Sequence, residues 1–199
     1  ELNGQEGKTL REKRFSAGAE RVLRSAQAAA LELGHGYVGC EHLLLGMLRE
    51  EEDAPARALR ASGVEEKKTR ELITRAVGRG DADLAPSQGL TPHARCAVEM
   101  AVTEAERSGS REIESGHLLL GMLRDGGNMA VRLLHREGVD THRLYGDTVR
   151  AMSLTVRRSP GGEPRASRGE SRNGKTLAEF TRDLTAMARE GRLDPVIGR

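Results

Sequence analysis

The 199 residues are 37% hydrophobic but only 2% aromatic, and the 32 basic and 30 acidic residues leave a formal net charge of +2. The core must therefore come from Leu, Val, Ala and Met, which favours helices packed on helices over a β-sandwich. Charges of both signs are mixed along most of the chain, which argues against a nucleic-acid groove. No apolar run is long enough to cross a bilayer, so we expect a cytoplasmic protein without a membrane partner.

The elements predicted in chain order begin after residues 1–14, a charged N-terminal extension that matches no helical pattern. A first helix is predicted from Ser16, a residue suited to an N-cap, to Leu33, just before Gly34. Apolar spacing predicts three more helices at residues 41–50, 55–61 and 65–77. These elements form a first unit at residues 15–77, and the glycine-containing segment 78–89 connects it to a second unit.

The second unit repeats the first. Residues 116–124 read GHLLLGMLR and nearly copy EHLLLGMLR at residues 41–49, so that His42 and His117 lie 75 residues apart (117 minus 42). The second unit, residues 90–152, begins a helix at Thr91, where a Thr cap precedes Pro92, and three more helices are predicted at 115–124, 129–136 and 141–152. We therefore predict an all-α fold of eight helices in two bundles.

The last part of the chain differs in composition. Residues 153–175 are rich in Ser, Pro, Gly and Arg, which is typical of a flexible basic linker. An amphipathic stretch at 177–189 comes next, and the chain ends with LDPVIGR at residues 193–199. We interpret residues 176–199 as the start of another domain.

The duplicated EHLLLGMLR segment and the terminal LDPVIGR together resemble the Clp family of AAA+ unfoldases (Hsp100), and within it the ClpC branch. The resemblance implies two tandem four-helix Clp repeats that receive protein substrates and adaptor proteins above a hexameric ATPase ring, which threads substrates into a Clp protease. Residues 176–199 would then begin the first AAA+ ATPase domain. A ClpB-type disaggregase and a stand-alone Clp-repeat adaptor or decoy are the alternatives.

The same resemblance implies that this chain is not itself an enzyme and holds no cofactor. ATP and magnesium would bind in the ring, and the isolated domain would be a monomer. Residues 169–176, GESRNGKT, do satisfy the G-x-x-x-x-G-K-[ST] phosphate-loop pattern. No apolar strand precedes them, however, and a phosphate loop must join a buried strand to a helix, so we do not expect nucleotide binding there.

Some ClpC relatives recognise phosphorylated arginine with a hydroxyl residue at the first helix and the Glu of a Gly-Thr-Glu-His motif. The matching residues of the first repeat are Ser16 and Glu41, which we predict as a ligand site. In the second repeat Thr91 is retained but Gly116 replaces the Glu, so this site is predicted to be weak or lost. The alternative interpretation is that Ser16 and Thr91 are ordinary helix caps.

The other chemically active residues are predicted to be structural. His42 and His117 occupy matching positions beside Leu runs, and no carboxylate or Cys recurs at metal-ligand spacing, so we expect buried, hydrogen-bonded histidines and no metal site. Cys40 and Cys96 lie inside apolar helical patterns and are predicted to be reduced core thiols. We find no catalytic constellation.

Overall fold

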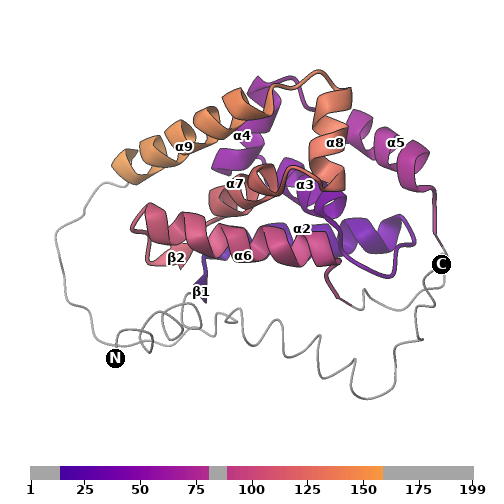
Figure 1. Cartoon of the computed structure of the whole chain (residues 1–199), viewed down its shortest axis with the longest axis horizontal. Helices are drawn as coiled ribbons and strands as arrows, with labels where there is room; N and C mark the ends of the chain where they lie inside the picture. The colour runs from indigo at the N-terminus through magenta and orange to yellow at the C-terminus, as the bar shows by residue number, and fades with distance from the viewer. Residues whose placement is uncertain (1–13, 81–88, 159–199) are drawn as a thin grey trace, which may run out of the picture.

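The computed structural model describes residues 14–80 and 89–158, with side chains to residue 153, and within these ranges the chain is almost entirely helical (Figure 1). The first repeat contains α2 (Ala17–Glu32), α3 (Cys40–Arg49), α4 (Ala54–Ala61) and α5 (Glu66–Val77). The second contains α6 (Pro92–Arg107), α7 (Ser115–Asp125), α8 (Met129–Arg136) and α9 (Thr141–Arg158). The predicted all-α fold with two four-helix repeats is confirmed.

The helix starts follow the predicted capping residues. The Ser16 side chain accepts a hydrogen bond from the Ala19 amide at 3.2 Å, and the Thr91 side chain accepts one from the Ala94 amide at the same distance. Helix α9 ends later than predicted: it continues past Met152 to Arg158. Neither Gly nor Pro occurs between these two residues, so nothing in the local sequence stops the helix.

The two repeats share one hydrophobic core, whereas the sequence predicted two bundles. Helix α4 of the first repeat packs against α9 of the second, and α5 packs against α8 (Figure 1). The core is continuous from Phe15 and Val22 in the first repeat to Leu119 and Leu144 in the second. Each repeat therefore buries apolar surface that it could not cover alone, and we expect the two to unfold together.

Within each repeat the first two helices cross at a glycine. A Cβ atom added to Gly46 of α3 would lie 2.5 Å from the Val22 carbonyl oxygen and 2.8 Å from the Ala26 amide of α2. Gly121 of α7 approaches Ala97 and Ala101 of α6 in the same way. The close helix contact thus requires glycine at both positions.

Two short parallel strand pairings, which the sequence did not predict, join the repeats crosswise. Strand β1 (Arg14–Phe15), at the start of the first repeat, pairs with β2 (Glu112–Ile113), just before α7 of the second. A matching isolated bridge joins Leu90, just before α6, to Val38, just before α3. The chain before the first helix of each repeat is therefore attached to the other repeat.

Several predictions concern residues outside the described ranges. They are the extension at residues 1–13, the linker from residue 159 onwards, the predicted AAA+ start at 176–199, and the GESRNGKT segment at 169–176. Arg14, assigned to the extension from the sequence, is part of β1.

Candidate ligand site at the start of helix α3

The start of α3 is fixed by two hydrogen-bonded histidines. The Gly39 amide donates to Nδ1 of His42 at 2.9 Å, so this nitrogen carries no proton. The Nε2–H of His42 then donates to Nδ1 of His35 at 2.8 Å, and the Nε2–H of His35 donates to the Gly78 carbonyl at 3.2 Å. Burial lowers the pKa of His42 to about 3, with a further contribution from His35. His42 is therefore neutral and ties the α3 start to the end of α5, and its predicted burial and hydrogen bonding are confirmed.

The carboxylate of Glu41 lies over this helix start. A Cβ atom on Gly39 would collide with it, so the Glu41 side chain bends back over the N-cap residue. Glu41 is buried, and this burial raises its carboxyl pKa, a rise partly offset by its own backbone amide and by His35. Its Oε1 lies 3.4 Å from Nδ1 of His42, but no ion pair forms because His42 is neutral. Glu41 is thus a buried carboxylate without a cationic partner among the described residues.

The helix cap beside Glu41 is Thr91 of the second repeat. The Thr91 amide donates to the Val38 carbonyl at 2.9 Å, and the Val38 amide donates to the Gly89 carbonyl at 2.8 Å. Val38 immediately precedes Gly39, over which the Glu41 carboxylate bends. The capped start of α6 therefore lies beside the start of α3, although the two helices belong to different repeats.

Ser16 lies at the opposite end of α3, so the structure does not bring it together with Glu41. Arg21, in the first turns of α2, contacts Glu50 at 3.0 Å and Asp53 at 3.3 Å, and both acids come after the end of α3. Since α3 has ten residues, its two ends are about 15 Å apart. The sequence prediction placed Ser16 and Glu41 in one site, whereas Thr91 is the helix cap that lies beside the start of α3.

The start of α7, which corresponds to the start of α3, carries different side chains. Ser16 donates its amide to the Ile113 carbonyl at 3.0 Å and so lies beside the start of α7, where Gly116 takes the place of Glu41. A Cβ atom on Gly116 would collide with Sδ of Met152 from α9. The space above the α7 start is therefore filled by a thioether. The weakness of the second site stays a prediction, to which the thioether adds a physical cause that the sequence did not reveal.

The second histidine repeats the capping role of the first. The Glu114 amide donates to Nδ1 of His117 at 2.9 Å, and Nε2 of His117 lies 3.0 Å from the Ser108 hydroxyl. The Ser108 hydroxyl donates to the Ala105 carbonyl at 3.1 Å, so the remaining proton in this contact belongs to His117. Both histidines are thus buried and structural, as predicted.

The thiols and acids provide no alternative site in the described part of the chain. Cys40 is buried and unpaired with another Cys, and burial raises its thiol pKa well above the ordinary value, which keeps it protonated. No group of three or more His, Cys, Asp or Glu side chains is placed to hold a metal ion in residues 14–80 and 89–153. None of the described helices is long and apolar enough to span a membrane.

Comparison with known proteins matches this arrangement to one family. The profile of the Clp repeat (R) N-terminal domain matches residues 14–136 and again 89–173. The chain belongs to the Clp repeat N-terminal domain family. ClpC/MecB of Bacillus subtilis is 36% identical over 186 residues, and ClpB of Oceanobacillus iheyensis is 35% identical over 188 residues. Each alignment covers 94% of this chain but only 22% and 23% of the relatives, so the chain spans less than a quarter of their length.

Solved structures show the same fold at lower sequence identity. The N-terminal domain of ClpD from Arabidopsis thaliana is 24% identical, with a TM-score of 0.60 over 70% of this chain and 95% of that one. A ClpV N-domain in complex with a VipB peptide is 18% identical, with a TM-score of 0.56 over 74% of this chain and 91% of that one. These neighbours support the double-repeat fold of the Clp N-terminal domain.

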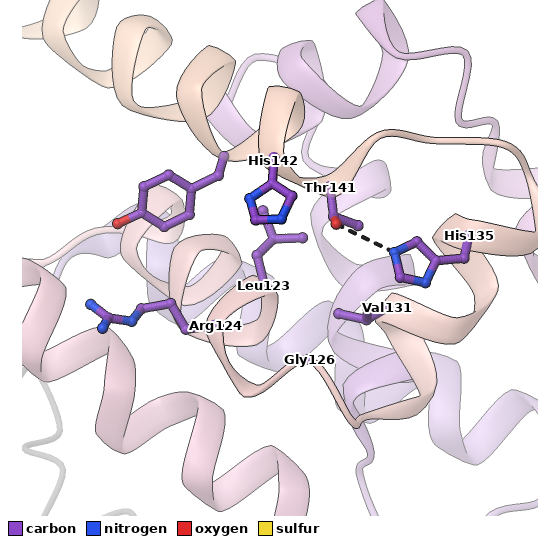
Figure 2. A pocket seen from close by; sticks show the side chains of 8 residues that line it. Leu123, Arg124, Gly126, Val131, His135, Thr141 and His142 are labelled. Carbon is purple, nitrogen blue, oxygen red and sulfur yellow. Dashed lines mark hydrogen bonds between the residues drawn. The ribbon is translucent and has the colours of Figure 1, made fainter.

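The repeats of this Clp N-terminal domain also differ at the ends of their second helices. In the second repeat a cleft of about 580 Å³ opens between α7, α8 and α9. Figure 2 shows His135 and Thr141 facing each other across it, joined by a 3.3 Å hydrogen bond. The first repeat has Glu66 in place of Thr141, and Glu66 accepts a hydrogen bond from Arg49 at 2.9 Å. In the second repeat the corresponding arginine, Arg124, pairs instead with Glu104 of α6 at 2.6 Å.

Proposed function

We propose that this chain is the docking domain of a ClpC-type, ATP-dependent protein unfoldase, receiving substrates and adaptor proteins for delivery to a Clp protease. Membership of the Clp repeat family and the similarity to ClpC/MecB support this role. We further propose that it recognises arginine-phosphorylated substrates at one site, formed by Glu41 of the first repeat and Thr91 of the second.

The buried carboxylate of Glu41 is the observation that carries the phosphoarginine proposal. The Glu41 carboxyl is buried and has no cationic partner among the described residues, and a guanidinium group would be its best bidentate partner. The phosphoryl group would lie toward the start of α6, where the free end of the helix carries a partial positive charge and Thr91 offers a hydroxyl. The ligand would thus bridge the two repeats.

The raised pKa of Glu41 gives this binding a definite pH dependence. The guanidinium requires an ionised carboxylate, and burial favours the protonated form. Affinity should therefore increase as the pH rises through the raised pKa of Glu41. Binding itself should release a proton in that range, because the guanidinium lowers the carboxyl pKa again.

The test is a titration of the chain with free phosphoarginine, monitored by amide chemical shifts. We expect shifts at the start of α3 and at Thr91, and their loss in Glu41→Gln. Ser16→Ala removes an equivalent helix cap at the opposite end of α3 and serves as the matched control, which should still bind. Free arginine and inorganic phosphate, added separately, should bind weakly. Absence of shifts near Gly39 and Thr91 would refute the phosphoarginine site while leaving the docking role open.

A ClpB-type disaggregase is the second candidate, because the Oceanobacillus ClpB is almost as similar to the chain as ClpC/MecB. The two functions differ in the fate of the substrate. The full-length parent protein, incubated with ATP, a labelled substrate and a Clp protease, should yield peptides if it is ClpC-type. Recovery of intact refolded substrate under the same conditions would favour the ClpB-type function.

A further inference from the structure

A small cleft lies where the two repeats meet on the side of α5 and α8. These helices are neighbours in space although they belong to different repeats (Figure 1). The cleft has a volume of about 200 Å³. Its lining combines an apolar floor with three arginines: Ala76, Met129, Leu133, Arg75, Arg132 and Arg136.

The three arginines make this cleft strongly cationic. Arg132 and Arg136 lie one turn apart on α8, so their side chains share a face, and Arg75 comes from α5 on the other side. No acidic residue lines the cleft, and within the described ranges none of the three guanidinium groups joins a hydrogen bond or ion pair. The nearby acid Glu137 is already occupied, because it accepts a hydrogen bond from Thr69 at 3.0 Å.

The duplication provides a matched cleft for comparison. The 75-residue offset places Arg57 at the position of Arg132, and Arg150 at that of Arg75, and both line the cleft between α4 and α9. There, however, Asp147 forms ion pairs with Arg150 and, at 3.7 Å, with Arg143. The residue that corresponds to Asp147 in the first repeat is Leu72. The α5–α8 cleft therefore has an arginine at each of these two matched positions but no acid at the position of Asp147.

We propose that the α5–α8 cleft binds an acidic peptide segment of a protein partner. Guanidinium groups bind carboxylates through paired, charge-assisted hydrogen bonds. Arg132 and Arg136 are spaced by about 6 Å, which suits two carboxylates one turn apart on a helix or two positions apart on an extended strand. The cleft is too small to enclose a folded element, so the partner contributes side chains to it. This site is separate from the Glu41 site and does not depend on phosphoarginine.

The test measures binding of a fluorescently labelled peptide of alternating Glu and Ala residues by anisotropy at low salt. Arg132→Gln combined with Arg136→Gln should weaken binding by about tenfold, because two charge-assisted contacts are lost. Arg57→Gln combined with Arg150→Gln removes the same charge from the matched cleft and should change affinity by less than about twofold. Equal weakening by both pairs would overturn the proposal, since it would show attraction by net charge alone.

Two further measurements keep the outcome specific. All four substituted arginines are at the surface, and urea unfolding should show that both double variants remain folded. Glu41→Gln should leave peptide binding unchanged, which separates this cleft from the phosphoarginine site. Inorganic phosphate is the second probe: binding of phosphate that depends on Arg132 and Arg136, without binding of the peptide, would overturn the assignment to carboxylates.

Discussion

The starts of α3 and α7 have the same capping geometry but different side chains at the next position. His42 and His117 each accept a hydrogen bond from a backbone amide at 2.9 Å, and both are buried. The residue before the histidine is a buried Glu41 in one repeat and Gly116 covered by Met152 in the other. Duplication has thus retained the residues that hold the fold and changed the residue that we propose as a ligand contact.

The two repeats also differ in the α4–α9 and α5–α8 clefts and at the ends of α3 and α7. The repeats neutralise matching arginines differently: Asp147 pairs with Arg150 where the first repeat has Leu72, and Arg49 pairs with Glu66 whereas its counterpart Arg124 pairs with Glu104. Since the core positions match and these surface positions do not, we infer that the two repeats share one structural task but contribute different residues to binding. Substitutions at matched positions of the two repeats can test this division.

The largest effect is expected at the crossing glycines, where the repeats should behave alike. Gly46→Val and Gly121→Val each push a side chain into the backbone of the neighbouring helix and should each lower the free energy of unfolding by about 3 kcal/mol. Gly146→Ala in α9 is the control: nothing lies near its Cβ position, so it should raise stability by about 0.5–1 kcal/mol. Urea unfolding measures all three, and a loss confined to one repeat would contradict the shared structural task.

The pH dependence of stability should depend on His42. Its folded pKa of about 3 lies below its ordinary value of 6.5, so the unfolded chain takes up a proton first as the pH falls. The stabilisation is complete above pH 6.5, declines below it, and should amount to a loss of about 2 kcal/mol between roughly pH 6.5 and pH 5. Urea midpoints measured across this range check the prediction.

A matched variant isolates that contribution. His42→Asn keeps an acceptor for the Gly39 amide but cannot be protonated, so its unfolding free energy should lose most of this slope. The raised pKa of Glu41 acts in the opposite direction, because its folded form binds a proton more readily as the pH falls. Both proteins should therefore carry Glu41→Gln during the comparison. An unchanged slope in the Asn variant would show that other groups control it.

The proposed loss of a phosphoarginine site in the second repeat can be tested by introducing the missing carboxylate. Gly116→Glu alone should not create a second phosphoarginine site, because Met152 occupies the space. Combined with Met152→Ala, it should raise the stoichiometry in calorimetry from one ligand to about two, with affinities within about tenfold of each other. A second site in the single variant would show that Met152 is not the obstacle.

The smallest effect is expected at the ion pairs that only the first repeat has. Glu66→Gln removes contacts to Arg49 at 2.9 Å and Arg70 at 3.4 Å, on partly exposed side chains, and should cost about 0.5 kcal/mol at low salt. High salt should abolish most of this difference. Glu99→Gln changes an exposed acid of α6 that joins none of the described ion pairs and should have no measurable effect. A larger loss of unfolding free energy for Glu66→Gln in high salt would indicate that this side chain stabilises the fold by packing and not by its charge.

The sequence by itself determined the duplicated unit, the helices with most of their ends, the capping roles of Ser16 and Thr91, and the buried, hydrogen-bonded state of the two histidines. These features depend on apolar periodicity and on contacts between residues three or four positions apart, which are written into the local sequence. The identity of Glu41 as a candidate ligand residue came from the resemblance to the Clp family.

Only the tertiary structure decided which of the candidate residues are neighbours. Thr91, not Ser16, lies beside the start of α3, because the two-residue strand pairings join each repeat to the other and leave no periodic pattern in the sequence. Met152, which covers Gly116 of α7, belongs to α9 and is distant in the sequence. The α5–α8 cleft likewise combines residues of both repeats. Such contacts arise from packing between distant segments, where many partners would satisfy the same local pattern.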